Sequence, residues 1–407
     1  MSRPLFHIRV LDLSRVLAGP WASQNLADLG AEVIKVERPG TGDDTRDWGP
    51  PFLKDRSGKE THESAYFLSV NRGKKSLTLD LSKPEGQKIA RELAAKSDVL
   101  IENYKVGGLA KYGLAYEDVK TLNPPIVDCS VTGFGQEGPL AHRPGYDFIF
   151  QGMGGLMSIT GERDDLPGGG PQKVGIAITD VMTGMYASLA ITAAIAHRER
   201  TGAGQYIDMA LLDTIVAFGA NQIFNWFTSG EVPKRYGNAH ANLLPYEVFP
   251  TADGHVILAC GNDSQWASFC KAADRPELAT DERFRTMPDR IRNRKVLIPV
   301  VQQIMKARAS KDWISRLEAA GVPCGPINNY REVFEDPQVK HRGLKIEMPH
   351  PLSGTMPGLA SPMRFSETPV TYDVPPPMLG QHTNEVLREV LGMKDAEIER
   401  LRKAGVV

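Results

Sequence analysis

The sequence predicts an α/β protein with a parallel sheet and a second, smaller α+β domain. At 407 residues the chain is longer than one ordinary compact domain. Its first third alternates short apolar strands with helices, which is typical of a parallel sheet covered on both faces. The texture then changes between about residues 225 and 325, and GVPCGPIN follows as a linker back to the first part.

The elements of the first third follow from apolar runs and turn residues. RVLDLS and EVIKVER are interpreted as buried strands, joined by a short helix, WASQNLADLG, that ends at Gly30. A second helix is expected in PEGQKIARELAAKS, with Pro84 in its first turn. DVLIENY and PIVDCSVTG add two further strands.

Further helices and strands are expected along the rest of the chain. A long apolar helix is predicted from Asp180 to about Arg198, where TGAGQ follows. In the middle region GHVILAC and a segment starting at Tyr246 are expected strands, while SQWASFCKAA and KVLIPVVQQIMKARAS are expected helices. The tail, NEVLREVLGMKDAEIERLRKAG, is expected to form an amphipathic helix after the proline-rich DVPPPMLGQHT.

Composition excludes several classes of partner. The formal net charge is −1, so no global field draws the chain to nucleic acid or to an anionic membrane. Its four cysteines form no CxxC pair and no zinc-ligand spacing, which favours a reducing, cytoplasmic location and no metal. No signal peptide is evident, and the longest apolar stretch, residues 185–196, is shorter than a membrane span.

Basic residues follow several predicted strands, on the side where open parallel sheets bind ligands. They suit a phosphate-bearing ligand, although scattered Lys and Arg are also common on solvated surfaces. The set comprises Arg38, Arg46, Arg72, Lys74, Lys75, Lys105, Lys111 and Arg143. The first turn reads AGP rather than GxGxxG, which weakens the interpretation as a dinucleotide-dependent oxidoreductase.

Asp180 is the one carboxylate within KVGIAITDVMTGMYASLAITAAIAHR. One interpretation is an N-cap that accepts backbone hydrogen bonds from Met182 or Thr183, which would keep the carboxylate ionised. The other is a covalent nucleophile, because a poorly solvated carboxylate is reactive. Spacing alone leaves both open. No GxSxG, HExxH or P-loop motif competes, and His240 in RYGNAHANLLPYEVF is the most interesting histidine.

Six segments, in order along nearly the whole chain, resemble the class III coenzyme A-transferases, a family that includes formyl-coenzyme A transferase. They are VLDLSRVLAGPWASQNLADLGAEVIKVERPGTGDDTR, NRGKKSLTLDL, PGYDFIFQGMGGLMSITG, VGIAITDVMTGMYA, GVPCGPINN and PPPMLGQHTNEVL. The resemblance implies a Rossmann-like, coenzyme A-binding large domain of residues 1–224 and 326–407, with a small domain of residues 225–325. It also implies an intertwined, ring-like homodimer.

The resemblance implies site residues one at a time. The nucleophilic aspartate of the family falls on Asp180. The coenzyme A contacts fall on Leu17, Ala18, Arg38, Leu79, Asp80, Leu81, Ser82, Asn103, Tyr104, Lys105, Lys111, Tyr146 and Asp147. For the distal carboxylate of a dicarboxylic acid the candidate cations are Arg15, Arg46, Arg72 and His240.

The chain departs from formyl-coenzyme A transferase at three places. Leu17 and Lys111 stand where that enzyme has glutamine and arginine, so one side-chain contact and one bidentate contact are lost. Residues 237–242 replace its glycine-rich loop, which disfavours oxalate as acceptor. RVLAGP, GDDTRDWGPPF, YFLSVNRGKKS, GNAHANLLPYEVF and GPINNYREVFEDPQV resemble most the branch that handles succinate and C5 dicarboxylates such as glutarate.

The implied reaction moves coenzyme A from an acyl-coenzyme A, such as succinyl-coenzyme A, to a free carboxylic acid. It needs no permanently bound cofactor. One alternative is a 2-methylacyl-coenzyme A racemase, but Tyr146 occupies the position of that branch's basic histidine. A non-catalytic acyl-coenzyme A-binding protein is the other alternative.

Overall fold

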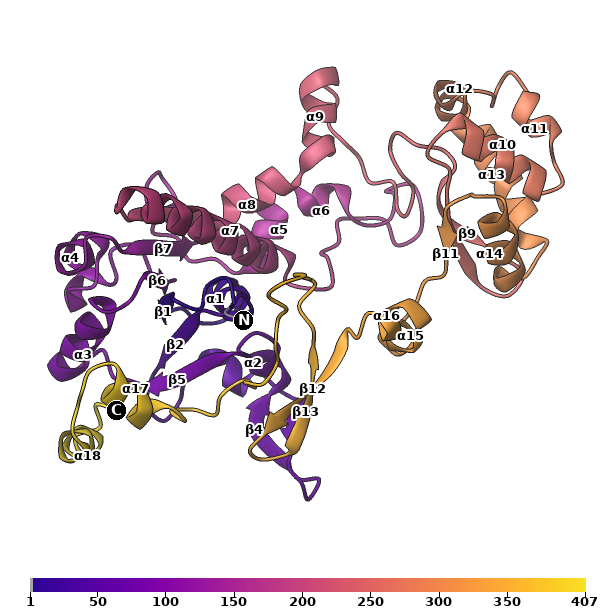
Figure 1. Cartoon of the computed structure of the whole chain (residues 1–407). Helices are drawn as coiled ribbons and strands as arrows, with labels where there is room; N and C mark the ends of the chain where they lie inside the picture. The colour runs from indigo at the N-terminus through magenta and orange to yellow at the C-terminus, as the bar shows by residue number, and fades with distance from the viewer. Residues whose placement is uncertain (1–2) are drawn as a thin grey trace. The chain divides into compact units, whose positions relative to one another are not determined.

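The computed structural model describes residues 3–407, which form two compact units (Figure 1). The larger unit contains the chain up to Leu156, Val174–Phe224 and Gln338–Val407. The smaller unit contains Met157–Lys173 and Asn225–Pro337. The chain therefore leaves the larger unit twice before its C-terminal segment completes it.

A six-stranded parallel sheet forms the centre of the larger unit. The strand order is β5-β2-β1-β6-β7-β8, and all five pairings are parallel. The strands are β1 (Arg9–Asp12), β2 (Glu32–Glu37), β5 (Lys74–Thr78), β6 (Val99–Glu102), β7 (Val127–Thr132) and β8 (Gln205–Ala210). Taken in chain order, these six strands lie 3-2-1-4-5-6, the Rossmann arrangement. The predicted parallel α/β sheet is confirmed, and its order reverses between β1 and β6.

Helices cover both faces of this sheet because its strands are apolar on both sides. Val10 and Val33 face one core, whereas their neighbours Leu11 and Ile34 face the other. One face is covered by α3 (Pro84–Ala94), α4 (Tyr116–Leu122), α17 (Thr383–Glu389) and α18 (Asp395–Lys403). The other is covered by α1 (Ala18–Asp28), α5 (Asp147–Met153), α7 (Ile178–Thr201) and α8 (Leu211–Phe218). Figure 1 shows α1 and α7 together, away from α3 and α18.

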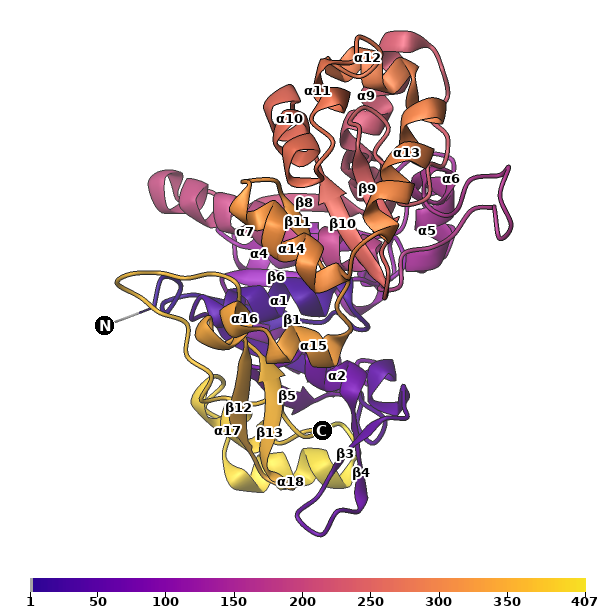
Figure 2. The ribbon, with the colours of Figure 1, turned by 90° about the vertical axis from the view of Figure 1, so that its right-hand side faces the viewer.

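The C-terminal segment returns to the edge of the sheet formed by the N-terminal third. The Thr78 N–H donates to Thr383 Oγ1 (3.1 Å), and Figure 2 shows α17 next to β5. The single amphipathic helix expected in the tail is wrong: α17 and α18 are separate helices. Between them Gly392 adopts a φ of 70°, a left-handed conformation that ends a helix.

Helix α7 is the one helix among residues 3–407 that is long and apolar enough to cross a membrane, by length and composition. The apolar stretch was expected to be too short, but the helix runs on to Thr201. Its inner face packs on α1 and the sheet through Ala187, Ile191 and Ile195. Met185, Tyr186 and Leu189 on its outer face are exposed.

Shorter elements flank the sheet or lie where the chain passes between the units. They are η1 (Asp44–Asp47), β3 (Phe52–Lys54), β4 (Glu60–Ser64), α2 (Ala65–Ser69), η2 (Ala110–Tyr112), α6 (Leu156–Ile159), α9 (Ala220–Ser229), α16 (Pro337–His341), β12 (Lys345–His350) and β13 (Gly354–Leu359).

The smaller unit is an α+β structure with its own core. Its antiparallel sheet has the order β11-β10-β9, comprising β9 (Tyr246–Pro250), β10 (His255–Ala259) and β11 (Cys324–Gly325). The helices are α10 (Asp263–Ala272), α11 (Glu277–Thr280), α12 (Met287–Arg292), α13 (Arg294–Lys306), α14 (Ser310–Ala319) and α15 (Tyr330–Glu335). Trp266, Phe269 and Trp313 stack in its core.

Candidate active site

Two adjoining cavities open at the carboxyl edge of the parallel sheet. They measure about 260 and 240 Å³, and Arg15, Asp44 and Tyr104 line both. Arg15 follows β1 and Tyr104 follows β6, the two strands between which the sheet order reverses. Open parallel sheets bind ligands at this place, because loops diverge there and leave a crevice.

The larger cavity lies beyond β2 and β5 and contains six of the residues implied for coenzyme A. These are Arg38, Leu79, Asp80, Leu81, Ser82 and Tyr104. Lys35 and Asp43 line the same cavity. Arg38, directly after β2, offers a cation to a phosphate group, whereas the N–H groups of Leu79, Asp80 and Ser82 are bonded within the protein.

The smaller cavity contains Asp180. Six other residues implied by the family resemblance share its wall: Leu17, Ala18, Asn103, Tyr104, Lys105 and Tyr146. Arg143 lines it as well, with its guanidinium 5.6 Å from the centre of the Phe134 ring. The structure therefore places one carboxylate among groups from the loops after β1, β6 and β7.

Asp180 is not the N-cap of α7, so that interpretation of the sequence is wrong. The helix begins at Ile178 after Ala177, whose side chain makes no capping bond. Asp147 instead accepts the Thr179 N–H at 2.7 Å and takes the role of the missing cap. Asp180, two residues into the helix, is left to line the cavity.

The electrostatic surroundings of Asp180 also differ from the expectation. Burial and the negative charge of Asp147 raise the pKa of Asp180 to about 7, against a backbone hydrogen bond from Ala18 that lowers it. At neutral pH the free protein thus holds a mixture of the acid and the carboxylate. Such a value suits a carboxyl group that is poorly solvated and therefore reactive when ionised.

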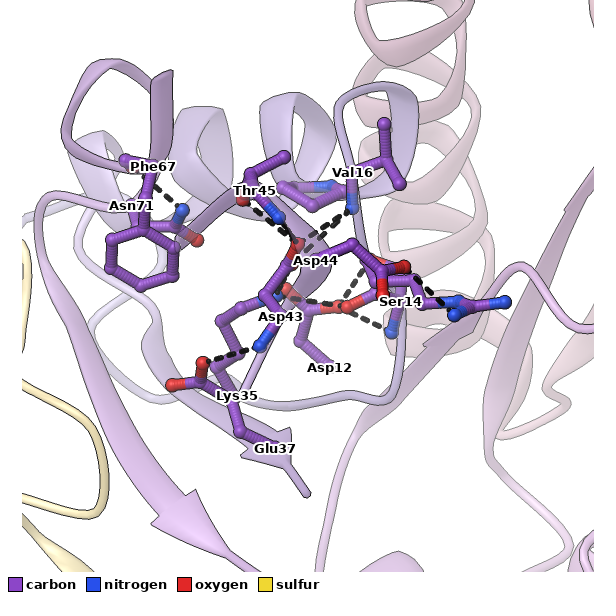
Figure 3. Close-up of polar contacts among 12 residues, drawn as sticks. Asp12, Ser14, Val16, Lys35, Glu37, Asp43, Asp44, Thr45, Phe67 and Asn71 are labelled. Carbon is purple, nitrogen blue, oxygen red and sulfur yellow. Dashed lines mark hydrogen bonds and ion pairs between the residues drawn. The ribbon is translucent and has the colours of Figure 1, made fainter. Parts of the chain in front are cut away.

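A buried polar network, drawn in Figure 3, includes Ser14, Lys35 and Asp43 from the wall of the larger cavity. Lys35 is fully buried, and its Nζ lies 2.8 Å from Asp43 and 2.9 Å from the Ser14 carbonyl oxygen. Burial alone would raise the pKa of Asp43, but Lys35 and the donors of Thr45 outweigh it and hold the value at about 2. Asp43 therefore stays ionised within the protein.

Several expected cations do not reach the cavity that holds Asp180. Arg46 is buried, bound to Glu37 through two nitrogens and to Glu63, and Arg72 pairs with Asp28. Lys74, expected among solvated or ligand-binding cations, is fully buried, which lowers its pKa to about 7 despite the nearby Asp12 and Asp43. These side chains are engaged inside the protein and are not available to a ligand. Their positions after predicted strands therefore did not indicate ligand binding.

Of three further predicted residues, two lie outside both cavities and one lines both. Lys111 lines neither cavity. Its Nζ lies 4.7 Å from the centre of the Tyr112 ring. His240 lies in the smaller unit, where its carbonyl oxygen accepts from Arg294 at 2.7 Å. Arg15 is exposed at the junction of the two cavities, paired with Asp44 at 2.8 Å. Among residues 3–407 no group of three His, Cys, Asp or Glu side chains is arranged to hold a metal.

Sequence reasoning missed Asp43 and Val16, which shape the loop after β1. Asp43 lies two residues before Thr45, a spacing typical of a side chain that accepts from the following backbone. That signal predicts a turn but not a contact with a loop 27 residues earlier. The left-handed backbone of Val16, with a φ of 72°, has no sequence signal at all.

A Rossmann-type sheet thus places a poorly solvated carboxyl group, Asp180, in one cavity beside a second cavity lined by both cations and acids. The model of CoA-transferase family III matches residues 5–383, and the chain belongs to this family. This membership confirms the resemblance found in the sequence motifs.

Individual relatives are similar along the full chain. The succinate–glutarate CoA-transferase of Agrobacterium fabrum is 49% identical over 387 residues, which is 95% of this chain and 96% of that protein. The human succinyl-CoA:glutarate CoA-transferase is 46% identical over 407 residues, 100% of this chain and 90% of that protein. The crystal structure of a CAIB/BAIF family protein from Brucella suis has 47% identity and a TM-score of 0.84, covering 96% and 100% of the two chains.

Proposed function

We propose that this protein transfers coenzyme A from succinyl-CoA to glutarate or a similar dicarboxylate, through acyl intermediates on Asp180. The observation that carries the proposal is the position of Asp180 in a cavity adjoining a second, phosphate-compatible cavity. The substrate pair follows from the named activities of the relatives that are 46–49% identical.

The two cavities divide the acyl-CoA between them in this proposal. The nucleotide end occupies the larger cavity, where Arg38 and the 79–82 loop meet its phosphates. The pantetheine arm passes Arg15 and Tyr104, which line both cavities, and brings the thioester to Asp180. Tyr146 and Lys105 border the arm near its reactive end.

The first half of the reaction breaks the thioester. A carboxylate oxygen of Asp180 attacks the carbonyl carbon, the C–S bond breaks, and the electron pair leaves on sulfur as the coenzyme A thiolate. The product on the protein is a mixed anhydride of Asp180 and succinate. The thiolate then attacks the aspartyl carbonyl, which forms an aspartyl thioester and releases free succinate.

The second half repeats these steps in reverse with the acceptor. Glutarate attacks the aspartyl thioester, which gives a new mixed anhydride and releases the thiolate again. The thiolate attacks the glutaryl carbonyl, so glutaryl-CoA leaves and the Asp180 carboxylate is regenerated. Each step exchanges one negatively charged oxygen or sulfur for another, so no net proton transfer is required.

The acceptor's second carboxylate needs a cation within reach. Arg15 and Arg143 line the cavity with Asp180, whereas Arg46 and Arg72 are consumed in buried ion pairs. We therefore assign the distal carboxylate to Arg15 or Arg143. His240 stays a proposal for the same role, located in the smaller unit.

The proposal includes an intertwined homodimer that acts in the cytoplasm. The exposed outer face of α7, with Met185, Tyr186 and Leu189, supplies apolar surface that suits a second copy of the chain. The four cysteines are unpaired, as expected in a reducing compartment. Residues 1–224 with 326–407 and residues 225–325 are its proposed large and small domains.

The test is a transfer assay with purified full-length protein. Succinyl-CoA is incubated with glutarate, adipate, acetate and oxalate in turn, and the acyl-CoA products are separated by chromatography. We expect glutaryl-CoA to form fastest with glutarate, and Asp180→Asn to lower its rate by about a thousandfold or more, since the nucleophile is lost.

The matched control is Asp213→Asn. Asp213 is the third residue of α8, as Asp180 is the third of α7, but it is exposed outside both cavities. Its substitution should leave the rate near that of the wild type. Transfer by Asp180→Asn at more than a few per cent of the wild-type rate would remove Asp180 from the proposed mechanism.

A further inference from the structure

In the loop that joins β1 to α1, five consecutive backbone N–H and carbonyl groups, from the Ser14 N–H to the Val16 N–H, are hydrogen-bonded to side chains of the larger unit. Asp12 accepts the Ser14 N–H at 2.9 Å, and Lys35 donates to the Ser14 carbonyl oxygen at 2.9 Å. Asn103 bonds both the N–H and the carbonyl oxygen of Arg15, at 3.1 and 2.7 Å. Asp43 then accepts the Val16 N–H at 3.2 and 3.3 Å.

Val16 needs this restraint more than its neighbours do. Its φ of 72° lies in the left-handed region, which a β-branched side chain avoids because its Cβ meets the following carbonyl oxygen. Released from its partners, the residue would return to a negative φ. Such strained conformations persist only where the surrounding structure over-determines them.

Asp43 is well suited to hold this N–H. Its side chain is almost fully buried, and every neighbour that contacts its oxygens is a donor: Lys35, Val16, and the N–H and hydroxyl of Thr45 (Figure 3). The ion pair with Lys35 fixes one oxygen at 2.8 Å. Thr45 fixes the other at 3.0 and 2.8 Å, so the carboxylate cannot turn away from Val16.

The far end of the loop reaches the reactive carboxylate. Leu17 precedes α1 with a non-helical backbone, and Ala18, the first residue of the helix, lines the same cavity as Asp180, where its backbone lowers the pKa of that carboxyl group. Gly184, one turn beyond Asp180, lies so close to α1 that a Cβ there would be 2.6 Å from the Ala18 carbonyl oxygen. Because α7 is packed closely against α1, the direction of the Ala18 N–H relative to Asp180 depends on the backbone conformation of Val16, two residues earlier.

We propose that Asp43 is a positioning residue for the transfer reaction: it holds Val16 in its left-handed conformation and thereby keeps the Ala18 N–H on the Asp180 carboxylate. This inference rests on the proposed role of Asp180. Asp43 does not itself contact Asp180. In this proposal it acts through Val16, in addition to pairing with Lys35.

The experiment is a double-mutant cycle of Asp43→Asn with Val16→Gly. An amide at position 43 keeps only one acceptor oxygen and turns N–H groups toward neighbours that are all donors, so its hold on Val16 is weakened. Glycine adopts a positive φ at no steric cost, so it should keep the productive loop without the restraint. We expect Asp43→Asn to lower kcat about tenfold in the wild-type background but less than about twofold in the Val16→Gly background.

A second readout separates positioning from general destabilisation. The Ala18 hydrogen bond lowers the pKa of Asp180, whereas Asp147 raises it; Tyr66 also lies within electrostatic reach of Asp180. Asp43→Asn should therefore move the acid limb of the kcat profile to higher pH, and adding Val16→Gly should move it back. Asp28→Asn, which breaks the buried ion pair with Arg72, should lower Tm without moving the limb.

Equal losses from Asp43→Asn in both backgrounds, or an unmoved acid limb, would overturn the inference. If Asp43→Asn does not fold, Thr45→Val replaces it in the cycle, because it keeps the charge pair but removes one donor from Asp43. The titration of carbon-13-labelled aspartate carboxyls, assigned with Asp180→Asn, reports the Asp180 pKa without any transfer. A wild-type protein that transfers nothing would thus refute the proposed function while this titration still decides the role of Asp43.

Discussion

Two neighbouring carboxyl groups, Asp147 and Asp180, lie near the first turn of α7 and have different roles. Asp147 caps the helix through the Thr179 N–H, and its charge adds to burial in raising the pKa of Asp180 to about 7. In the proposed mechanism Asp180 attacks as a carboxylate, so activity should rise with pH through that value. At pH 6 about a tenth of Asp180 would be ionised in the free protein.

Asp147→Asn tests this arrangement. The amide oxygen can still accept the Thr179 N–H, but the negative charge is gone, so the pKa of Asp180 falls. The acid limb of kcat/KM for succinyl-CoA should move to lower pH, with a relative gain at pH 6 compared with the plateau. Asp213→Asn serves as the control and should leave the limb in place. A limb that stays where it was, or moves upward, would contradict the electrostatic role of Asp147.

The residue scale is where sequence reasoning was least complete. Asp180 stands out as a lone acid in an apolar run, and likeness to a family indicates its role. The fates of Arg46 and Lys74 could not be predicted, because their buried acidic partners lie 9 to 62 positions away. The left-handed Val16 was equally hidden, since only tertiary contacts sustain it.

Among the elements, the contact between α1 and α7 sets the position of Asp180, the proposed nucleophile. Gly184 permits this contact: an added Cβ would lie 2.6 Å from the Ala18 carbonyl oxygen and 2.8 Å from the Trp21 Cβ. Alanine normally favours a helix over glycine by about 1 kcal/mol. Here overpacking against backbone should outweigh that preference.

Gly184→Ala should therefore lower both stability and transfer. We expect a loss of roughly 1–3 kcal/mol in the free energy of unfolding, and a fall in kcat because Asp180 moves away from Ala18. Chemical denaturation and the transfer assay measure the two effects. Gly175→Ala is the matched control, because its Cβ would meet no atom within 4 Å. A Gly184→Ala protein as stable and active as the control would show that the close contact is unimportant.

Apolar periodicity predicted most helices and strands but not their neighbours in space. The runs at β1, β2, β6 and β7 mark buried strands, yet nothing in them gives the order that sets the cavities between β1 and β6. The start of α7 was misplaced because Ala177 is not a typical capping residue. The break at Gly392 was missed because the apolar pattern continues across it.

The whole molecule presents apolar surface that a single chain leaves uncovered. Leu189 on α7 is 66% exposed, although α7 is among the most apolar helices of the chain. Residues 157–173 pack with the smaller unit, which composition could not show because that segment is short and rich in turns. The proposed homodimer thus rests on likeness to a family and not on apolar periodicity.

Light scattering after size-exclusion chromatography tests the proposed homodimer. One chain has a mass of 44.7 kDa, so the dimer should give about twice that, near 89 kDa. Leu189→Glu puts a charge on the exposed face of α7 and should shift the protein toward smaller or aggregated species. Glu199→Gln, near the exposed end of the same helix, should leave the mass unchanged. A wild-type mass of one chain would contradict the dimer.

If Asp180 forms acyl intermediates, hydroxylamine should trap them on its side chain. The protein is mixed with succinyl-CoA and then with hydroxylamine, and its peptides are sequenced by mass spectrometry. We expect a hydroxamate on Asp180, absent without succinyl-CoA and absent from Asp180→Asn. Glutaryl-CoA formation by a wild-type protein that yields no adduct at Asp180, or yields it on another carboxylate, would contradict the account.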